Sequence, residues 1–266
     1  MIMNLTPIAS VKNPTIKLIN ALLTSNRQRN KHGKTVIEGT HLLDSAIAIA
    51  YPIEQVLLSQ TAMQSNEVIT LLKKLKNNNQ AINIQVVDNK LYQNIRTLGT
   101  GIDIMAVLPI NPKKLGTINS DCLILNDVQD SGNVGTLLRT AAAIGIQHII
   151  CSTGTAGVWS PKTLRAGMGA QFSLDIYENV QIDDIVLYVK TQMMATSSHT
   201  NNLIYSQNLS TPIAWIMGHE GQGVCPELLK LATPIALPQP NGQESLNVAV
   251  AGSLCMYEML RQRSYS

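Results

Sequence analysis

The chain has 266 residues, of which 45% are hydrophobic, and its 20 basic and 17 acidic residues give a formal net charge of +3. This length suits one large domain or two ordinary ones, each with a buried core. The ordinary apolar content excludes disordered and fibrous classes, and no apolar run approaches the roughly 18 residues of a membrane span.

Cysteine usage and the first residues bear on location. No C-x-x-C pair is present, and the cysteines are single and far apart: Cys122, Cys151, Cys225 and Cys255. We therefore expect no zinc or other metal site, and reduced thiols in a cytoplasmic protein. The first residues lack the charged start and apolar core of a signal peptide, so no membrane partner is expected.

Charge is unevenly distributed along the chain. Residues 1–37 contain six basic residues and no acidic residue, so the remainder carries a net charge of −3. A basic segment on a near-neutral body predicts a polyanionic partner such as RNA. A solvated helix surface is the alternative. The basic residues are Lys12, Lys17, Arg27, Arg29, Lys31 and Lys34.

The first hundred residues alternate between helical and strand patterns. Apolar residues at helical spacing predict helices over 13–26, 41–50 (with Thr40 as N-cap) and 67–76. Short apolar runs predict strands over 35–38, 55–59, 82–87 and 104–108. The alternation predicts a small α/β domain over residues 1–108, and the polar stretch 109–120 predicts a linker.

Beyond the linker, residues 121–266 have a different texture. Strands with near-continuous apolar runs alternate with helices, which predicts a parallel sheet covered on both faces. The expected strands include 122–126, 148–151 and 213–217, and the expected helices are an Ala-rich one over 137–144 and a final one. The fold class is therefore α/β in both domains.

The first candidate site follows the strand that ends at Asn126. A polar loop with two glycines leads to a helix that begins near Asn133. Ligands of parallel sheets bind beyond the carboxyl ends of the strands, so this loop is a candidate for chemistry. Arg139 is either functional there, or a charge on the helix surface, or paired with Asp127 or Asp130. The glycine spacing fits neither a dinucleotide fingerprint nor a P-loop, which argues against a nicotinamide oxidoreductase.

The second candidate site contains three glycines within six residues. The stretch 215–224 reads W-I-M-G-H-E-G-Q-G-V. Such spacing indicates positive φ angles or a close approach of the backbone to a ligand. Glu220 lies at the tip of this loop, and a sharp turn with a solvated Glu is the alternative.

The third candidate site is a Pro- and Gly-containing loop that runs into the final helix. Residues 237–252 read L-P-Q-P-N-G-Q-E-S-L-N-V-A-V-A-G. Ser245 is the predicted N-cap, and Asn247 either binds ligand or makes a structural hydrogen bond. The small residues of the helix permit close packing. Its core candidates are Leu246, Val248, Val250 and Leu254.

Together these three stretches resemble the motifs of the SpoU (TrmH-like) RNA 2′-O-ribose methyltransferases of the SPOUT class. The motifs are N-D-V-Q-D-S-G-N-V-G-T-L-L-R-T-A, G-x-E-G-x-G-V and L-P-x-x-x-G-x-E-S-L-N-V-A-V-A, and the likeness covers residues 121–263. Residues 160–170 resemble the family's R-A-x-x-G-A stretch. The E-G-x-H-L-L-D run at 38–44 resembles the family's substrate-binding domain, which is similar to ribosomal proteins that bind kinked RNA.

The resemblance implies a fold, a cofactor and a partner. It implies a deep trefoil knot in the C-terminal domain, S-adenosylmethionine in the knotted loops, and a homodimer whose active site takes residues from both subunits. The implied cofactor pocket comprises Met217, Gly218, Leu237, Ser245, Leu246 and Asn247. The residues implied around the reaction are Asn133, Arg139, Glu220 and Asn247.

Two positions depart from the family pattern. His219 stands where the family usually has Ser or Asn, and Ser131 stands where Pro is common. An imidazole can titrate near neutral pH. We nevertheless expect His219 to be a hydrogen-bonded loop residue rather than a catalytic one.

The predicted reaction transfers a methyl group from a sulfonium to a ribose 2′-hydroxyl in structured RNA. Ribosomal RNA is the expected substrate, with tRNA as the alternative. A non-catalytic RNA-binding protein that keeps the fold is the competing class. The guanidinium of Arg139 stays protonated and is expected to stabilise the developing alkoxide. Asn133 and Glu220 are expected to orient it. The predicted RNA contacts are Arg27, Arg29, Lys31 and Lys34.

Overall fold

The computed structural model describes residues 6–77, 82–240 and 245–264. The chain divides into two compact units. One joins the chain up to Asn111 with Trp159–Phe172, and the other joins Pro112–Val158 with the part from Ser173 onward. The sequence-based division assigned residues 159–172 to the second domain, whereas the contacts group them with the first unit.

The first unit is built on a four-stranded sheet in the order β1-β4-β2-β3. β4 pairs antiparallel with β1 and β2, and β2 pairs parallel with β3. The strands have the predicted positions within two residues: β1 (Lys34–Glu38), β2 (Gln55–Ser59), β3 (Asn83–Val87) and β4 (Ile104–Pro109).

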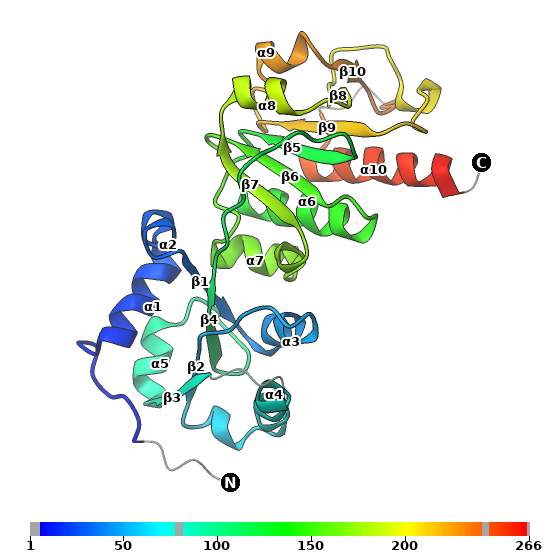
Figure 1. Ribbon diagram of the computed structural model, residues 1–266. Coiled ribbons are helices and arrows are strands. Elements are labelled where there is room, and N and C mark those ends of the chain that lie inside the picture. Colours follow the sequence, from blue (N-terminus) through cyan, green and yellow to red (C-terminus); the bar gives the residue numbers. More distant parts are fainter. Residues whose placement is uncertain (1–5, 78–81, 241–244, 265–266) are drawn as a thin grey trace. The chain divides into compact units, whose positions relative to one another are not determined.

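Helices cover both faces of this sheet. α1 and α5 lie on one face, and α3 and α4 lie on the other (Figure 1). Ile19 and Leu22 of α1 pack with Leu57 and Val107 of the sheet in one buried cluster. The helices are α1 (Pro14–Thr24), α2 (Asn26–His32), α3 (Thr40–Ala48), α4 (Asn66–Asn77) and α5 (Asn89–Ile95).

Two helix boundaries differ from the prediction. Ser25 is extended and ends α1, and its side chain accepts a hydrogen bond from Gln28 N at 3.3 Å, so the predicted helix over 13–26 ends early and a second helix begins. Thr40 does not cap α3. Gly39, at φ 91°, precedes the helix and Thr40 is its buried first residue. A φ of this size favours glycine.

The segment 159–172 joins the first unit through β1. The Thr35 hydroxyl donates a hydrogen bond of 2.6 Å to the Trp159 carbonyl oxygen. Ser160 caps α7 (Pro161–Gly167) by accepting a hydrogen bond from Thr163 N, and Met168 ends it in the left-handed region. A 3₁₀ helix (Ala170–Phe172) follows, in which Phe172 packs against Tyr51 with ring centroids 5.0 Å apart.

The second unit contains a six-stranded sheet in the order β10-β8-β9-β5-β6-β7, and each pairing is parallel. β5 and β9 are buried along their whole length, as their apolar sequences predict. The strands are β5 (Cys122–Asn126), β6 (His148–Ser152), β7 (Asp175–Val180), β8 (Gln192–Thr196), β9 (Ile213–Gly218) and β10 (Thr233–Ile235).

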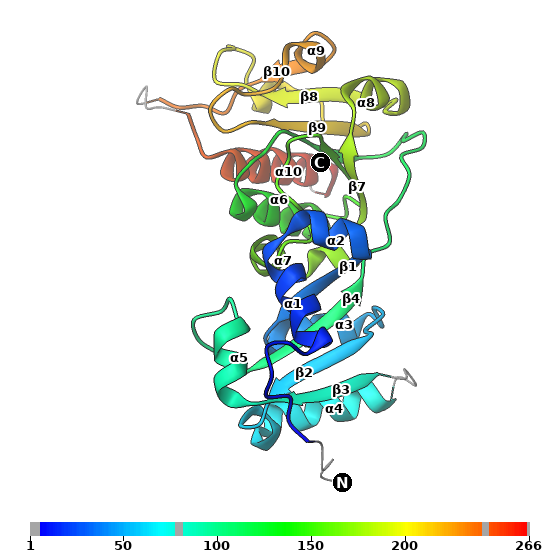
Figure 2. The ribbon, with the colours of Figure 1, turned by 90° about the vertical axis from the view of Figure 1, so that its left-hand side faces the viewer.

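Helices also cover both faces of the second sheet. α6 (Ser131–Ala143) and α10 (Val248–Ser264) lie together on one face, and α8 (Ile182–Tyr188) and α9 (Pro226–Leu229) lie on the other (Figures 1 and 2). Gly252 permits the close packing of α10, because a Cβ there would lie 2.6 Å from Leu137 Cδ2 and 2.9 Å from Met217 Sδ.

None of the helices in the described part of the chain combines the length and apolar composition that a bilayer span requires. Within the same residues, no group of three or more His, Cys, Asp or Glu side chains is arranged to hold a metal ion. The four cysteines are free thiols.

Candidate functional site

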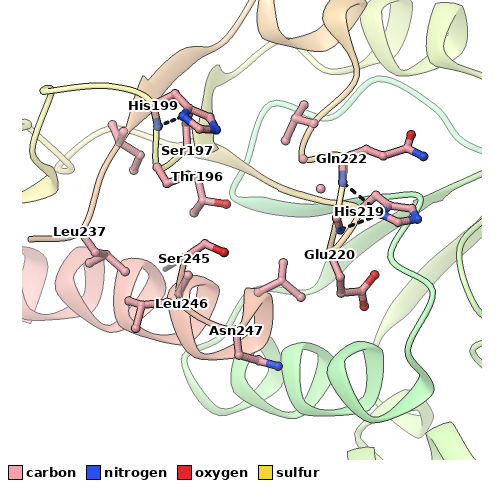
Figure 3. A pocket seen from close by; sticks show the side chains of 18 of the residues that line it. Thr196, Ser197, His199, His219, Glu220, Gln222, Leu237, Ser245, Leu246 and Asn247 are labelled. Atoms are coloured by element: carbon pink, nitrogen blue, oxygen red, sulfur yellow. Dashed lines mark hydrogen bonds between the residues drawn. The ribbon is translucent and has the colours of Figure 1, made fainter. Parts of the chain in front are cut away.

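A cavity of about 400 Å³ lies at the carboxyl ends of β8, β9 and β10. Ligands of open parallel sheets bind at this end, and the volume lies in the range of small-molecule sites. Three neighbouring loops form its wall (Figure 3). The lining residues are Thr196–His199, Gly218–Val224, Leu229, Ile235, Leu237, Gln239, Ser245–Val248 and Ala251.

The order of the strands brings the first two motifs together. β5 and β9 are neighbours, and Asn126 pairs with Gly218 at their carboxyl ends. The loops after these strands therefore leave the sheet side by side. The Asn126 side chain joins them, since its Oδ1 accepts a hydrogen bond of 2.7 Å from Cys225 N.

The loop after β9 folds back tightly on itself. His219 and Gly223 exchange two backbone hydrogen bonds, of 3.0 and 2.8 Å. A Cβ at Gly218 would lie 2.2 Å from the carbonyl carbon of Gly223, which requires glycine at position 218. Gly223 has φ 73°, a region that L side chains rarely adopt. Gly223 therefore has the positive φ that the glycine spacing predicts, whereas Gly218 is required by crowding within the loop itself.

Glu220 at the tip of this loop binds the loop of the first motif. Its Oε1 accepts hydrogen bonds from Asp130 N at 3.0 Å and Asn133 Nδ2 at 2.9 Å, and its Oε2 accepts one from Gln129 N at 3.1 Å. Partial burial raises the pKa of Glu220, but these hydrogen bonds outweigh it and the net shift of the pKa is downward. The carboxylate is therefore ionised at neutral pH.

The third motif joins the same network through Asn247. Asn247 Nδ2 donates a hydrogen bond of 2.9 Å to Asn133 Oδ1. Its Oδ1 accepts hydrogen bonds from Ala249 N and Val250 N, so Asn247, and not the predicted Ser245, caps α10. An unbroken chain of side chains, Asn247–Asn133–Glu220, thus connects the three motifs.

Most of the predicted cofactor residues line the cavity: Gly218, Leu237, Ser245, Leu246 and Asn247. Met217 does not. Its side chain is fully buried behind the wall, where its sulfur accepts a hydrogen bond of 3.6 Å from the Thr196 hydroxyl. The alternation of side chains along β9 sends the side chain before Gly218 into the core.

Of the four residues predicted around the reaction, three form the network and one does not. Arg139 is exposed on α6 and lies outside the cavity lining. Among the residues that the structure describes, it has no hydrogen bond or ion pair, including to Asp127 or Asp130. Asp130 instead caps α6 through Gly132 N and Asn133 N.

Sequence reasoning missed one wall of the cavity. The segment after β8 contributes Ser197, Ser198 and His199, and Gln239 faces the same space from the last loop. The strand order explains why the segment after β8 reaches the cavity, because β8 lies between β9 and β10 in the sheet. This segment carries none of the three motifs. A polar run directly after an apolar strand was the available signal.

The final helix exposes part of the surface that the sequence predicted as core. Val248 is half-buried, but Leu246, Val250 and Leu254 are 39%, 49% and 47% exposed, and Tyr257 is 52% exposed. Val250, Leu254 and Tyr257 are spaced along α10 so that they form one stripe, and Leu246 lies just before the helix. Such a contiguous apolar stripe marks an interaction surface more often than chance exposure does.

The predicted RNA contacts of the first unit fall into different environments. Arg27 and Lys31 are exposed on α2. Lys34 pairs with Glu54 at 2.5 Å. Arg29 is only 5% exposed, and its Nη1 donates a hydrogen bond of 2.6 Å to the Leu22 carbonyl oxygen. Arg29 therefore ties α2 to α1, and its predicted contact with RNA is wrong for this conformation.

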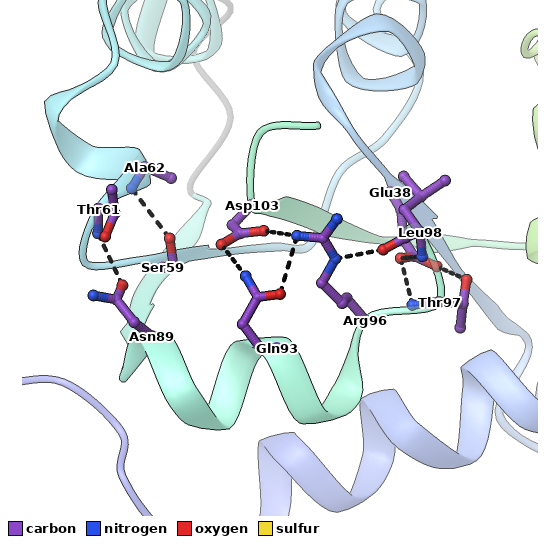
Figure 4. A network of polar contacts seen from close by, with 10 residues as sticks. All are labelled: Glu38, Ser59, Thr61, Ala62, Asn89, Gln93, Arg96, Thr97, Leu98 and Asp103. Atoms are coloured by element: carbon purple, nitrogen blue, oxygen red, sulfur yellow. Dashed lines mark hydrogen bonds and ion pairs between the residues drawn. The ribbon is translucent and has the colours of Figure 1, made fainter. Parts of the chain in front are cut away.

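The E-G pair at 38–39 has a structural role in the same unit. Buried Glu38 accepts hydrogen bonds from the Thr97 hydroxyl, from Thr97 N at 2.9 Å and from Leu98 N at 3.2 Å (Figure 4). Arg96 pairs with Asp103 at 2.6 Å. These contacts hold the loop between α5 and β4 against the end of β1.

Comparisons with known proteins agree with this architecture. The model of the SpoU rRNA Methylase family matches residues 121–257, and that of the MRM3-like substrate binding domain matches residues 13–106. The 23S rRNA (guanosine(2553)-2′-O)-methyltransferase RlmP of Bacillus subtilis is 28% identical over 95% of this chain and 98% of its own. The human mitochondrial rRNA methyltransferase 3 is 25% identical over 92% of this chain and 71% of its own.

Solved structures share the fold. The AdoMet-bound rRNA methyltransferase from Sinorhizobium meliloti has a TM-score of 0.83 at 24% identity and covers 98% of this chain and 99% of its own. The SpoU methyltransferase AviRb from Streptomyces viridochromogenes has a TM-score of 0.82 at 19% identity, over 94% of this chain and 98% of its own. Since the first family model spans more than half of the sequence, the chain belongs to the SpoU rRNA methylase family.

Proposed function

We propose that this protein transfers a methyl group from S-adenosylmethionine to a ribose 2′-hydroxyl of ribosomal RNA. The observation that carries the proposal is the side-chain chain Asn247–Asn133–Glu220, which joins three distant motifs at the edge of a cavity of about 400 Å³. A fold that needed only stability would not require ionised and amide groups to converge there.

The lining of the cavity fits S-adenosylmethionine. Leu237, Leu246 and Ile235 offer apolar surface for a flat base. The backbone of the glycine loop, residues 218–224, offers amides and carbonyls. Ser197 and His199 add polar groups for an amino-acid tail. When bound, the cofactor supplies a methyl group activated by its positive sulfur.

The remaining chemistry concerns the ribose oxygen. It gives up its proton, ultimately to solvent, and approaches the methyl carbon in line. The negative charge that develops on the oxygen as the proton leaves is removed as the carbon–oxygen bond forms, while the carbon–sulfur bond breaks and the sulfonium would become a neutral thioether. We assign Arg139 to that charge, because a guanidinium remains protonated in proteins and cannot serve readily as the base. Asn133, Glu220 and Asn247 fix the loops that receive the substrate.

A homodimer would complete this site. Arg139 lies outside the lining of its own cavity, while the apolar stripe of α10 (Val250, Leu254 and Tyr257) is exposed. We propose that two copies bury these stripes against each other and that Arg139 serves the cavity of the partner. We also propose that the loops around the cavity are knotted, as in the family that the motifs resemble.

The relatives, the exposed basic residues and the cysteines bear on the substrate and the location. The relatives named for ribosomal RNA favour this substrate over tRNA. Arg27 and Lys31 of the first unit are exposed, which suits contact with phosphates. Free cysteines fit a reducing compartment such as the cytoplasm.

The deciding experiment maps 2′-O-methyl groups in total RNA from cells with and without the protein. A site that is lost in ribosomal RNA supports the proposal, and a site lost in tRNA moves the activity to the other substrate. An unchanged map, with no binding of S-adenosylmethionine by calorimetry, favours the non-catalytic RNA-binding protein.

A second experiment tests the roles of Arg139 and of the dimer. Arg139→Ala should bind S-adenosylmethionine but lose methyl transfer by at least about 100-fold, the scale of one lost oxyanion donor. If subunits share their sites, mixing and reassembling inactive Arg139→Ala with an inactive Asn247 variant should restore transfer. Full activity of Arg139→Ala would remove this residue from the mechanism.

A further inference from the structure

His219 occupies an unusual hydrogen-bonding position in the wall of the cavity. Its Nδ1 accepts two backbone hydrogen bonds, from Gly221 N at 2.9 Å and from Gln222 N at 3.2 Å (Figure 3). The imidazole therefore closes the loop from inside, in addition to the two backbone hydrogen bonds between His219 and Gly223.

This geometry fixes the protonation state. Backbone N–H groups only donate, so a ring nitrogen that accepts from two of them must carry a free lone pair. His219 is thus neutral, with its proton on Nε2. A proton on Nδ1 would turn the acceptor into a donor that faces two other donors, and both hydrogen bonds would be lost.

The same geometry explains how histidine can replace the smaller residues expected at this position. Asn and Ser side chains accept hydrogen bonds from backbone N–H groups two or three residues onward. His219 Nδ1 makes the same two contacts, at residues 221 and 222. The substitution keeps the acceptor but places it on an imidazole, a side chain that can also bind a proton.

The loop that His219 closes has little freedom to adjust. A Cβ at Gly218 would lie 2.2 Å from the carbonyl carbon of Gly223, so the two loop ends are already in close contact. The loop also carries Glu220, whose carboxylate holds Gln129, Asp130 and Asn133. Loss of the His219 contacts would therefore disturb both the cavity wall and the network.

We propose that His219 is a positioning residue whose neutral imidazole holds the loop 218–224, in the wall of the cavity, in its closed form. Protonation of the ring releases this loop and weakens cofactor binding below neutral pH. The proposal rests on the proposed function and adds to it a residue and a pH dependence. It concerns the affinity for cofactor and assigns His219 no contact with the reacting atoms.

Other titratable groups surround this loop. Glu220 follows His219, His199 lines the same cavity, and the adjoining loop after β5 carries Asp127 and Asp130. Glu227 lies in α9, which follows the loop. Because carboxylates ordinarily titrate well below neutral pH, the two histidines are the groups of this set that can change charge between about pH 5.5 and 8.

The test measures S-adenosylmethionine affinity by calorimetry between about pH 5.5 and 8. Wild-type affinity should fall at least about 10-fold at the acid end, which corresponds to about 1.4 kcal/mol. His219→Asn should retain most of the affinity at pH 8 and lose the pH dependence, whereas His219→Ala should bind weakly throughout. The control His41→Ala, at an exposed position outside the cavity lining, should keep the wild-type acid-side loss.

The outcomes are distinguishable. An unaltered pH dependence in His219→Asn, or wild-type affinity in His219→Ala, overturns the proposal. Imidazole nitrogen NMR of the free protein is independent of cofactor and should show His219 with its proton on Nε2 at pH 8. A proton on Nδ1 overturns the proposal, while an intact Nε2–H tautomer in a protein that binds no S-adenosylmethionine contradicts the proposed function instead.

Discussion

Asn247 Nδ2 donates a hydrogen bond of 2.9 Å to Asn133 Oδ1, although the two residues are 114 positions apart in the sequence. The other end of the Asn247 side chain caps α10 through Ala249 N and Val250 N. One amide therefore serves two purposes, helix capping and the connection between motifs, and substitutions can separate them.

The two roles of Asn247 predict different effects for two variants. Asn247→Asp keeps an oxygen for the cap but loses the donor to Asn133, so methyl transfer should fall while the melting temperature changes little. Asn247→Ala loses both and should also be destabilised by about 1 kcal/mol, the usual value of a cap. Thermal melting and transfer assays check this pair, and equal stability of both variants would contradict the capping role.

Glu220 should make stability depend on pH in the acid range. Its folded-state pKa is lowered, so its contribution to the free energy of unfolding is present above the unfolded pKa, about 4.3, and is lost as pH falls through the folded value. The stability difference between wild type and Glu220→Gln should be constant near neutral pH and shrink below about pH 4. Urea unfolding at several pH values measures it, and a constant difference throughout would contradict the assignment.

The basic residues of α2 should divide into RNA-binding and structural ones. Arg27→Gln with Lys31→Gln should leave the melting temperature unchanged, weaken RNA binding, and reduce the slope of log affinity against log salt by roughly 1.4–1.8 for two lost phosphate contacts. Arg29→Gln should instead lower the melting temperature, because buried Arg29 binds the Leu22 carbonyl. An unchanged salt slope in the double variant would show that α2 does not touch phosphate.

Gly252 should tolerate no side chain. A Cβ there would contact Leu137 and Met217 at less than 3 Å, and overpacking of this kind costs about 1–3 kcal/mol. Gly252→Ala should therefore lower the free energy of unfolding measured in urea. Ala251→Gly is the neighbouring control for helix propensity alone, at about 1 kcal/mol, and a Gly252→Ala protein as stable as wild type would contradict the packing.

Local sequence patterns determined much of this protein. The four strands of the first sheet, the strands β5, β6 and β9 of the second and the three motifs were predictable, because strand burial and glycine requirements depend on short stretches of chain. The family followed from the motifs and is confirmed by the family model over residues 121–257. Of the residues predicted to bind the cofactor, all except Met217 line the cavity.

Only the tertiary structure decided how these pieces meet. The strand order puts Asn126 beside Gly218 and leaves β8 next to the cavity, and no local pattern encodes that order. The tertiary structure buries Arg29 and leaves Arg27 and the apolar stripe of α10 exposed. Amphipathic spacing alone does not reveal which face of a helix another element covers. The role of His219 likewise required coordinates: the sequence placed an imidazole in a tight loop, but hydrogen-bond direction identified Nδ1 as an acceptor.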